Sequence, residues 1–443
     1  MDSLVVLRHA LGEGRRMFRD RPSLDRHAEA LARRHLRWVV AHSPHTAQRF
    51  ARAGLSPDEW RHLPATDKAE MMAHFDTLNT AGLRLADVLR VARHAEASRD
   101  FTPTLRGELT VGLSTGTSGS QGAFVVSRAE RLRWAGVVLR HLLPDWPRGL
   151  LRRHRVAFLL RAEGNLYRSV QGRRLDFRFL DLLRPVADLA TDLTAYAPTL
   201  LVGPPSVLRA LLDAGATARP ERVVSVAEVL EDDDREALAR GFGPVVQVYQ
   251  ATEGLLGLPC PHGELHLNEA HVHFDLEELG GGVVRPVVTD LRRRTQPIIR
   301  HRLDDLLVLG DECACGLASR RVLRVAGRQD DALWLPSVTG AGWAVVWPDF
   351  LRGALARVSG LREYRVEQVG PHELHLRLNP LTPDTQAGAC HEVRLALGRS
   401  GADPAAVVLT PLPLPPPAPG AKRRRVTRSW NSTWKGSPED RTP

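Results

Sequence analysis

Short apolar runs with strand character alternate with helical segments between residues 108 and 249, and this alternation constrains the fold most strongly. The runs read ELTVGLS, RVAFLL, TLLVG, RVVSVA and VVQVY, and helical patterns begin near Ser127, Pro205 and Asp232. Strands separated by helices pair in parallel, because each helix carries the chain back to the start of the next strand. The pattern therefore predicts an α/β fold with a mostly parallel sheet covered by helices.

The regions on either side of this alternation predict further parts. A chain of 443 residues exceeds what one hydrophobic core usually organises. Residues 1–100 are helical in pattern, and residues 263–309 alternate at the period of antiparallel or barrel-like strands. We expect residues 1–100 and 101–327 to form a large domain, residues 328–428 a small α+β domain, and the polar residues 429–443 a disordered tail.

Composition and charge exclude several classes of protein. A hydrophobic fraction of 43% without an apolar run of about 20 residues excludes a membrane-spanning protein. The N-terminus resembles an amphipathic helix more than a signal peptide, so we expect a cytoplasmic location. The net charge of +10 invites a nucleic-acid function, but arginines are scattered among acids along the whole chain. Basic residues are clustered only in the run KRRR at residues 422–425.

A loop of small residues follows the first strand-like run, in the stretch VGLSTGTSGSQGAFVVS at residues 111–127. Backbone amides freed by glycine, together with Ser and Thr hydroxyls, can wrap phosphate oxygens at such a turn. The loop is not a Walker P-loop, because Ser120, Gln121 and Gly122 stand where that motif requires Lys and then Ser or Thr. It predicts a nucleotide-binding loop, with an ordinary Ser- and Gly-rich surface loop as the alternative.

Four motifs in the same order resemble those of the adenylate-forming superfamily, which contains the acyl- and aryl-CoA ligases. The phosphate loop of that superfamily is similar to STGTSG at residues 114–119, and its Tyr-Gly-x-Thr-Glu motif is similar to YQATEG at 249–254. IIRHRLDD at 298–305 resembles the segment that ends in a ribose-binding aspartate. GRQDD at 327–331 resembles the hinge between the large and small domains.

Within that superfamily, the chain resembles the branch of phenylacetate–CoA ligases and deazaflavin-coenzyme adenylating synthetases. The resemblance rests on LPATDKAEMMAHF near residue 70, LLVGPPSVLRALL near 205, SVAEVLEDDDREAL near 230 and CACG at 313–316. It covers nearly the whole chain. It implies an enzyme that uses ATP and Mg²⁺ to activate a carboxylic acid as an acyl-AMP, with release of pyrophosphate and transfer of the acyl group to a thiol such as coenzyme A or a carrier.

The resemblance also implies roles for individual residues. Thr252 and Glu253 would contact the α-phosphate, and Glu253 would coordinate Mg²⁺. Asp305 would accept hydrogen bonds from the ribose hydroxyls, with Arg328 beside it. The nucleotide is further expected to contact Ser114, Thr115, Gly116, Thr117, Ser118, Gly119, Glu228 and Tyr249. As alternatives, Glu253 would be a surface acid after a strand and Asp305 a turn residue.

A lysine near the C-terminus is the remaining part of the expected machinery. Members of the superfamily carry one that enters the site for adenylation, and Lys422 in GAKRRRV fits that position. The chain has only three lysines, Lys68, Lys422 and Lys435, so a lysine at this place is informative. The alternative is a solvated basic tail or one that touches RNA.

Cysteine spacing also predicts a metal site. Cys260, Cys313 and Cys315 with His262 form a Cys₃His set consistent with tetrahedral zinc, and His266 is an alternative ligand. Free buried thiols are the competing interpretation. Cys390 lies on a predicted helix and is expected in the core.

Two departures from the superfamily pattern bear on the reaction, one on each half-reaction. Gln121 and Gly122 replace the usual Pro-Lys after the phosphate loop, which removes one cation for pyrophosphate. The segment LWLPSVTGAGWAVVWPDF lacks the usual pattern that shapes a pantetheine path, which weighs against coenzyme A.

The alternatives to an acid–thiol ligase are an enzyme that forms an AMP ester of a hydroxyl substrate and a homologue that has lost its chemistry. The acid and a homodimeric state remain open. The acyl pocket is expected at residues 165–167, 203–206 and 227–228.

Overall fold

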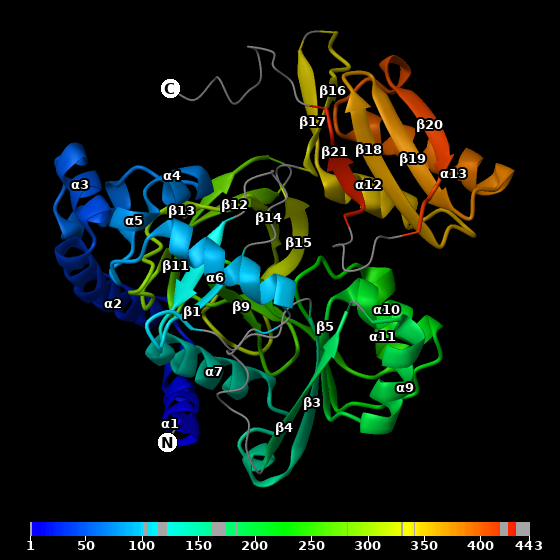
Figure 1. The fold of residues 1–443 in the computed structure, drawn as a ribbon. Helices are drawn as coiled ribbons and strands as arrows, with labels where there is room; N and C mark the ends of the chain where they lie inside the picture. Colours follow the sequence, from blue (N-terminus) through cyan, green and yellow to red (C-terminus); the bar gives the residue numbers. More distant parts are fainter. Residues whose placement is uncertain are drawn as a thin grey trace. The chain divides into compact units, whose positions relative to one another are not determined.

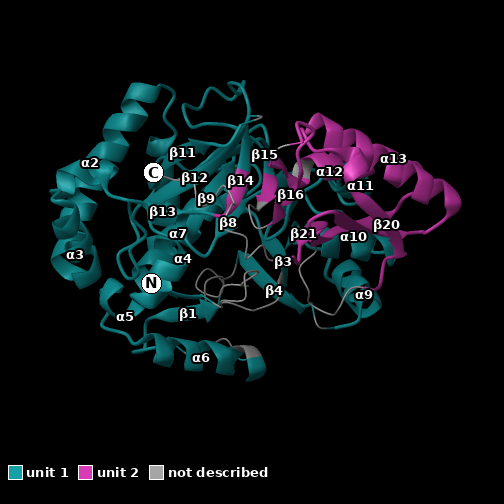
Figure 2. Ribbon diagram, turned by 90° about the horizontal axis from the view of Figure 1, so that it is seen from above, with its two compact units in different colours: residues 1–303, 307–325 teal, residues 304–306, 326–443 magenta. Residues whose placement is uncertain are grey.

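The computed structural model describes residues 2–98, 100, 104–113, 122–160, 174–182, 184–280, 282–328, 331–340, 342–416 and 424–430. The chain divides into two compact units (Figure 2). The first contains residues 1–303 and 307–325, and the second contains residues 304–306 and 326–443. The main division thus falls two residues before the end of the large domain expected at residue 327.

Helices fill the first hundred residues. Their bounds are α1 (Asp2–Glu13), α2 (Arg21–His42), α3 (Pro44–Ala53), α4 (Lys68–Ala73), α5 (Phe75–Leu78) and α6 (Leu85–Ser98). Local chemistry starts several of them: the Asp20 side chain accepts from the Ser23 amide at 2.8 Å, and Ser43 accepts from the Thr46 amide at 3.3 Å. These side chains satisfy amide groups that the first turn of a helix leaves without a partner.

A five-stranded parallel sheet forms the centre of the first unit and confirms the predicted α/β class. Its strands run in the order β4-β3-β5-β6-β7, with every neighbouring pair parallel. Their bounds are β3 (His154–Leu160), β4 (Leu175–Asp181), β5 (Leu200–Gly203), β6 (Arg222–Ser225) and β7 (Val245–Gln247). Because β3 has β4 on one side and β5 on the other, the strand order reverses next to β3.

Different layers cover the two faces of this sheet. Helices α9 (Val186–Tyr196), α10 (Pro205–Asp213) and α11 (Asp232–Gly241) lie together on one side of it (Figure 1). Their apolar residues share a core with Leu201 and Val223 of the sheet. On the other face, α7 (Arg128–Leu142) and β9 (Gly254–Pro259) contribute to a second core. Burial on both faces explains why the central strand β5 is apolar throughout.

The first strand-like run does not join the parallel sheet, contrary to the sequence prediction. It forms β1 (Thr110–Leu113), which pairs antiparallel with β2 (Ala123–Val126). Nine residues separate the two strands. A parallel crossover needs about a dozen or more residues, so a connection of this length favours an antiparallel pair.

The predicted antiparallel region is present after β7. One sheet has the order β10-β9-β8, with β8 (Tyr249–Ala251) and β10 (Leu265–Leu267). A second has the order β11-β12-β14-β15, with β13 paired to β12. The strands of this second sheet are β11 (Val272–Glu278), β12 (Val283–Asp290), β13 (His301–Arg302), β14 (Asp305–Leu309) and β15 (Val322–Arg328).

The second unit has the predicted α+β composition. A hairpin of β16 (Leu333–Pro336) and β17 (Trp343–Val346) precedes α12 (Pro348–Leu355). A four-stranded sheet follows in the order β20-β19-β18-β21, and α13 packs into the same core. These elements are β18 (Glu363–Gly370), β19 (Glu373–Asn379), α13 (Pro383–Arg399), β20 (Val408–Pro413) and β21 (Val426–Arg428). Among the described residues, no helix is both long enough and apolar enough to cross a membrane.

Candidate functional site

Two loops that leave the parallel sheet at its carboxyl edge meet. The loop after β5 enters α10 at Pro205, and the loop after β6 contains Ala227 and Glu228. The Ser206 amide donates to Glu228 Oε2 at 3.3 Å, which joins the two loops. Ala227 has a φ of 69°, in the left-handed region that non-glycine residues rarely adopt. Ligands of open parallel sheets bind at this edge, so the loops predicted to line a substrate pocket occupy a suitable place.

The Thr252–Glu253 turn connects β8 to β9 and carries the predicted metal-binding carboxylate. Glu253 Oε1 lies 3.7 Å from His301 Nε2, with only 11% and 4% of the two side chains exposed. His301 belongs to the IIRHRLDD segment, which enters as β13 beside β12. The structure therefore brings two of the sequence motifs into direct contact. The sequence analysis did not single out His301, although it stands inside a motif that the analysis quoted.

A buried arginine, Arg293, donates a hydrogen bond to the same turn. Arg293 Nη1 donates to the Thr252 carbonyl oxygen at 2.7 Å, and Nη2 donates to Gln296 Oε1 at 2.9 Å. Gln296 Oε1 also accepts from the Val125 amide of β2 at 2.9 Å. Two hydrogen bonds from one planar guanidinium fix its orientation as well as its position. The turn is thus tied to the strand that follows the Ser- and Gly-rich loop.

Asp290 and Glu130 fix the segment that carries Arg293. Asp290 Oδ1 accepts from the Arg292 and Arg293 amides at 2.7 and 2.9 Å, and burial raises the pKa of this carboxyl. Glu130 Oε1 accepts from the Arg294 amide at 2.6 Å. Glu130 also closes a capping box with Ser127 at the start of α7, a pattern that the local sequence can show. Its contact with the Arg294 amide spans 164 positions of the chain, which a local pattern cannot show.

The remaining predicted nucleotide residues fall in several parts of the structure. Tyr249 is buried in β8, Asp305 is half-buried at the start of β14, and Arg328 is the last residue of β15. By compactness Asp305 belongs to the second unit and Glu253 to the first. The phosphate-loop residues Ser114–Gly119, the pocket residues 165–167 and Lys422 lie outside the described residues.

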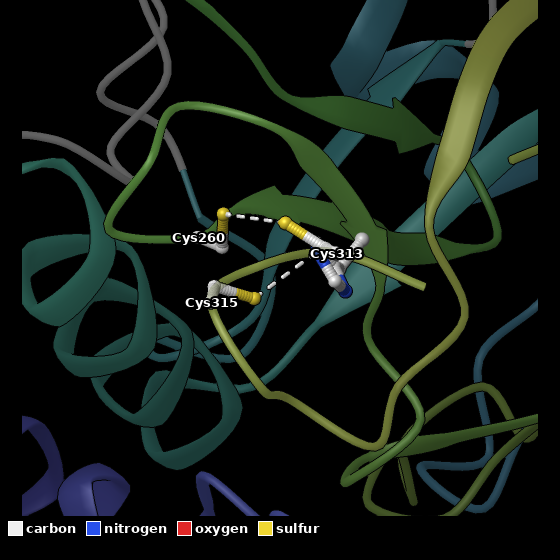
Figure 3. Close-up of side chains that lie close together, drawn as sticks. Cys260, Cys313 and Cys315 are labelled. Carbon is white, nitrogen blue, oxygen red and sulfur yellow. Dashed lines mark hydrogen bonds between the residues drawn. The ribbon is translucent and has the colours of Figure 1, made fainter. Parts of the chain in front are cut away.

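Three thiols and one imidazole form a separate cluster. Cys260 Sγ lies 3.9 Å from Cys313 Sγ, and Cys315 Sγ lies 3.5 Å from His266 Nε2. Figure 3 shows the cysteine sulfur atoms directed toward one another. All four donor atoms lie within 4.8 Å of one another. The sequence analysis placed His262 first in this set, and the structure corrects that choice, because His262 is exposed and His266 joins the thiols.

Comparisons with known proteins place this geometry in context. No protein-family model matches the chain. Over 118 residues it is 27% identical to protein CapK of Staphylococcus aureus, and the match spans about a quarter of each chain. Among solved structures, 2-hydroxyisobutyryl-CoA ligase in the postadenylation state with 2-HIB-AMP aligns with a TM-score of 0.68 at 18% identity. That alignment covers 94% of this chain and 92% of the ligase.

A second solved structure of similar fold is named as an amido synthetase and not as a CoA ligase. The GH3.15 acyl acid amido synthetase aligns with a TM-score of 0.55 at 10% identity, covering 85% of this chain and 82% of the synthetase. The alignments extend over nearly the whole chain, so the resemblance is not confined to one domain. The chain therefore has the fold of the adenylate-forming ligases.

Proposed function

We propose that the protein is an adenylate-forming ligase, which joins a carboxylic acid to the AMP part of ATP and releases pyrophosphate. The observation that carries this proposal is the contact between the Thr252–Glu253 turn and His301, because it unites two motifs of that chemistry in a chain with the corresponding fold. In the reaction, a carboxylate oxygen attacks the α-phosphorus while the bond from that phosphorus to the pyrophosphate oxygen breaks.

Charge develops on the α-phosphate during this step, and the chain has residues suited to it. The glycine-rich loop at 114–119 supplies amide and hydroxyl donors, and Thr252 contacts the α-phosphate. Asp305 accepts from the ribose hydroxyls, and Lys422 supplies a cation for the first half-reaction. Glu253 offers the carboxylate donor that Mg²⁺ prefers. When bound, Mg²⁺ neutralises charge on the phosphate oxygens.

Transfer to a thiol is the second half of the proposal. The 2-hydroxyisobutyryl-CoA ligase in the thioesterification state, with 2-HIB-AMP and CoA, shares this fold at a TM-score of 0.55. The thiol displaces AMP from the acyl-AMP, so that the carbon–oxygen bond to phosphate breaks as the thioester forms. A hydroxyl substrate adenylated without a second step is the alternative, and it is favoured by the segment at residues 333–350, which lacks the usual pantetheine pattern.

Pyrophosphate–ATP exchange with Mg²⁺ tests the proposal. The assay is run against a panel of aryl, fatty and polyene acids and a deazaflavin. We expect exchange that depends on one class of acid and that falls at least about a hundredfold in Glu253→Gln. Glu278→Gln, on an exposed position of β11, is the matched control and keeps full exchange.

The same assay separates the alternatives. Exchange with the deazaflavin alone identifies nucleotidyl transfer to a hydroxyl. Binding of ATP without exchange across the panel, measured by equilibrium dialysis, contradicts acid activation by these substrates and favours a homologue that retains only the nucleotide site.

A further inference from the structure

We infer that Cys260, His266, Cys313 and Cys315 form a structural zinc site that clips the β9–β10 hairpin to the segment between β14 and β15. The inference goes beyond the proposed activity and does not depend on it. It rests on the local geometry of two turns, the tautomer of one histidine and the distances between the four donor atoms.

The β9–β10 hairpin explains why His266 is a ligand and His262 is not. The Gly263 amide donates to the Cys260 carbonyl at 2.9 Å, and Gly263 has a φ of +84°, so residues 261–263 form a tight loop. His262 lies within this loop, is exposed, and does not belong to the cluster. His266 stands opposite Leu258 in the ladder. Because side chains alternate along a strand, Cys260 faces the same side as Leu258 and His266.

The other two ligands lie on a second tight turn. The Gly316 amide donates to the Cys313 carbonyl at 3.0 Å, and Gly316 has a φ of +70°. This turn places Cys313 and Cys315 on one side, facing the hairpin. The Leu317 amide donates toward Cys315 Sγ at 3.5 Å.

His266 has the tautomer that a metal ligand requires. Its Nδ1 lies 2.8 Å from the Ser319 carbonyl oxygen. A carbonyl can only accept, so Nδ1 carries the hydrogen and Nε2 keeps its lone pair. Nε2 is the atom that faces Cys315 Sγ at 3.5 Å. A ring nitrogen held by a backbone carbonyl while the other faces the metal is the usual arrangement around protein-bound zinc.

Two separations in the cluster match those around a tetrahedral ion and are too long for a disulfide. Zinc–sulfur bonds of about 2.3 Å and zinc–nitrogen bonds of about 2.0 Å place tetrahedral ligand atoms about 3.8 Å (sulfur to sulfur) and about 3.5 Å (sulfur to nitrogen) apart. The observed separations are 3.9 Å from Cys260 to Cys313 and 3.5 Å from Cys315 to His266. A disulfide would bring two sulfur atoms to about 2.05 Å.

The types of ligand atom favour zinc as the metal, and the four filled positions favour a structural role for it. Three thiolates and an imidazole in tetrahedral geometry favour zinc over the harder Mg²⁺ or Mn²⁺. All four positions are filled by side chains, as in structural sites, whereas a catalytic zinc keeps one open. The site joins residues 53 positions apart in the chain. Cys260 directly follows the last residue of β9, and Glu253 directly precedes its first residue.

Metal analysis of the purified full-length protein tests the inference. We expect about one zinc ion per chain and no iron, measured by mass spectrometry after gel filtration. His266→Ala and Cys313→Ser should lower the zinc content at least about tenfold. Two matched controls should keep it: His262→Ala, which changes the other histidine of the hairpin, and Cys390→Ser, which changes the fourth cysteine, in α13.

X-ray absorption spectroscopy of the unmutated protein gives a result even where a variant fails to fold. Three sulfur atoms and one nitrogen around zinc are expected. A metal-free protein that takes up no zinc on dialysis, iron in place of zinc, or a zinc content that depends on His262 and not on His266 would each overturn the inference.

Discussion

Arg293 Nη1 donates a hydrogen bond of 2.7 Å to the carbonyl oxygen of Thr252, inside the first unit. The guanidinium is almost completely buried, and its second arm meets Gln296. Through Gln296, the same arginine is connected to the Val125 amide in β2. The turn that carries Glu253 therefore depends on a residue more than forty positions away, which has no part in any of the sequence motifs.

Replacement of Arg293 by methionine should unfold the protein more easily and weaken the proposed activity. The Thr252 carbonyl and Gln296 Oε1 would each lose a donor in a buried environment, which costs about 2–4 kcal/mol of unfolding free energy. Urea denaturation followed by circular dichroism measures this loss. Arg219→Met, at an exposed position, is the control and should change the free energy by less than about 0.5 kcal/mol. A stability of Arg293→Met equal to that of the control would contradict the role of Arg293.

Among the described residues, two helices begin with a Ser–Glu capping box, and only one of these boxes should matter strongly for stability. Glu130 accepts from the Ser127 amide at 2.8 Å and from the Thr295 amide at 2.9 Å. Burial alone would raise the pKa of Glu130, but these amides outweigh it and hold the pKa below its ordinary value. Glu59 caps its short helix through Ser56 alone and is exposed.

Glu130→Gln should lower the free energy of unfolding by about 2–3 kcal/mol, because its NH₂ group would face backbone donors in a buried site. Glu59→Gln should leave the midpoint of thermal unfolding nearly unchanged. Differential scanning fluorimetry of both variants at pH 7 makes the comparison. Equal shifts in the two variants would show that Glu130 acts only as a local cap.

His35 in α2 predicts a loss of stability in mild acid. Its side chain is buried, and burial followed by the charge of Arg294 lowers its pKa from 6.5 to about 3. Below pH 6.5, His35 therefore binds a proton in the unfolded chain but stays neutral in the folded chain. The contribution of neutral His35 to the free energy of unfolding is therefore complete above pH 6.5. It is lost as the pH falls toward 3, with a slope of up to about 1.4 kcal/mol per pH unit.

His35→Leu should reduce this slope between pH 6.5 and 4, whatever its effect at pH 7.5. Urea unfolding at several pH values measures the slope in the variant and in the unmutated protein. His62→Gln, at an exposed histidine, should keep the original slope. An unchanged slope in His35→Leu would assign the acid sensitivity to other buried groups.

Local patterns predicted much of the fold, and contacts between distant segments account for what they missed. Alternation of strands and helices predicts a parallel sheet, because period and connection length are local properties. The placement of β1 in that sheet was wrong, since its connection to β2 is too short for a crossover. The choice of His262 was wrong for a similar reason: strand register, and not closeness in sequence, brings His266 to Cys260. Arg293 gave no signal, because arginines are abundant along the chain.

The three lysines offer a direct test of the proposed two-step mechanism. Lys422 is proposed to supply a cation only while the acyl-AMP forms. In Lys422→Ala, pyrophosphate–ATP exchange should fall at least about a hundredfold, because the charge that develops on the α-phosphate loses a partner. Thioester formation from a supplied acyl-AMP should keep its rate, since AMP leaves without that cation.

Lys435→Ala is the matched control, because it removes one of the other lysines from the same C-terminal stretch of sequence. It should leave both half-reactions unchanged. If Lys422→Ala slows both half-reactions equally, the lysine does not act in adenylation alone. A general effect of the basic run on folding or on nucleotide binding would then explain the loss, and the affinity for ATP measured in the same variant distinguishes those two causes.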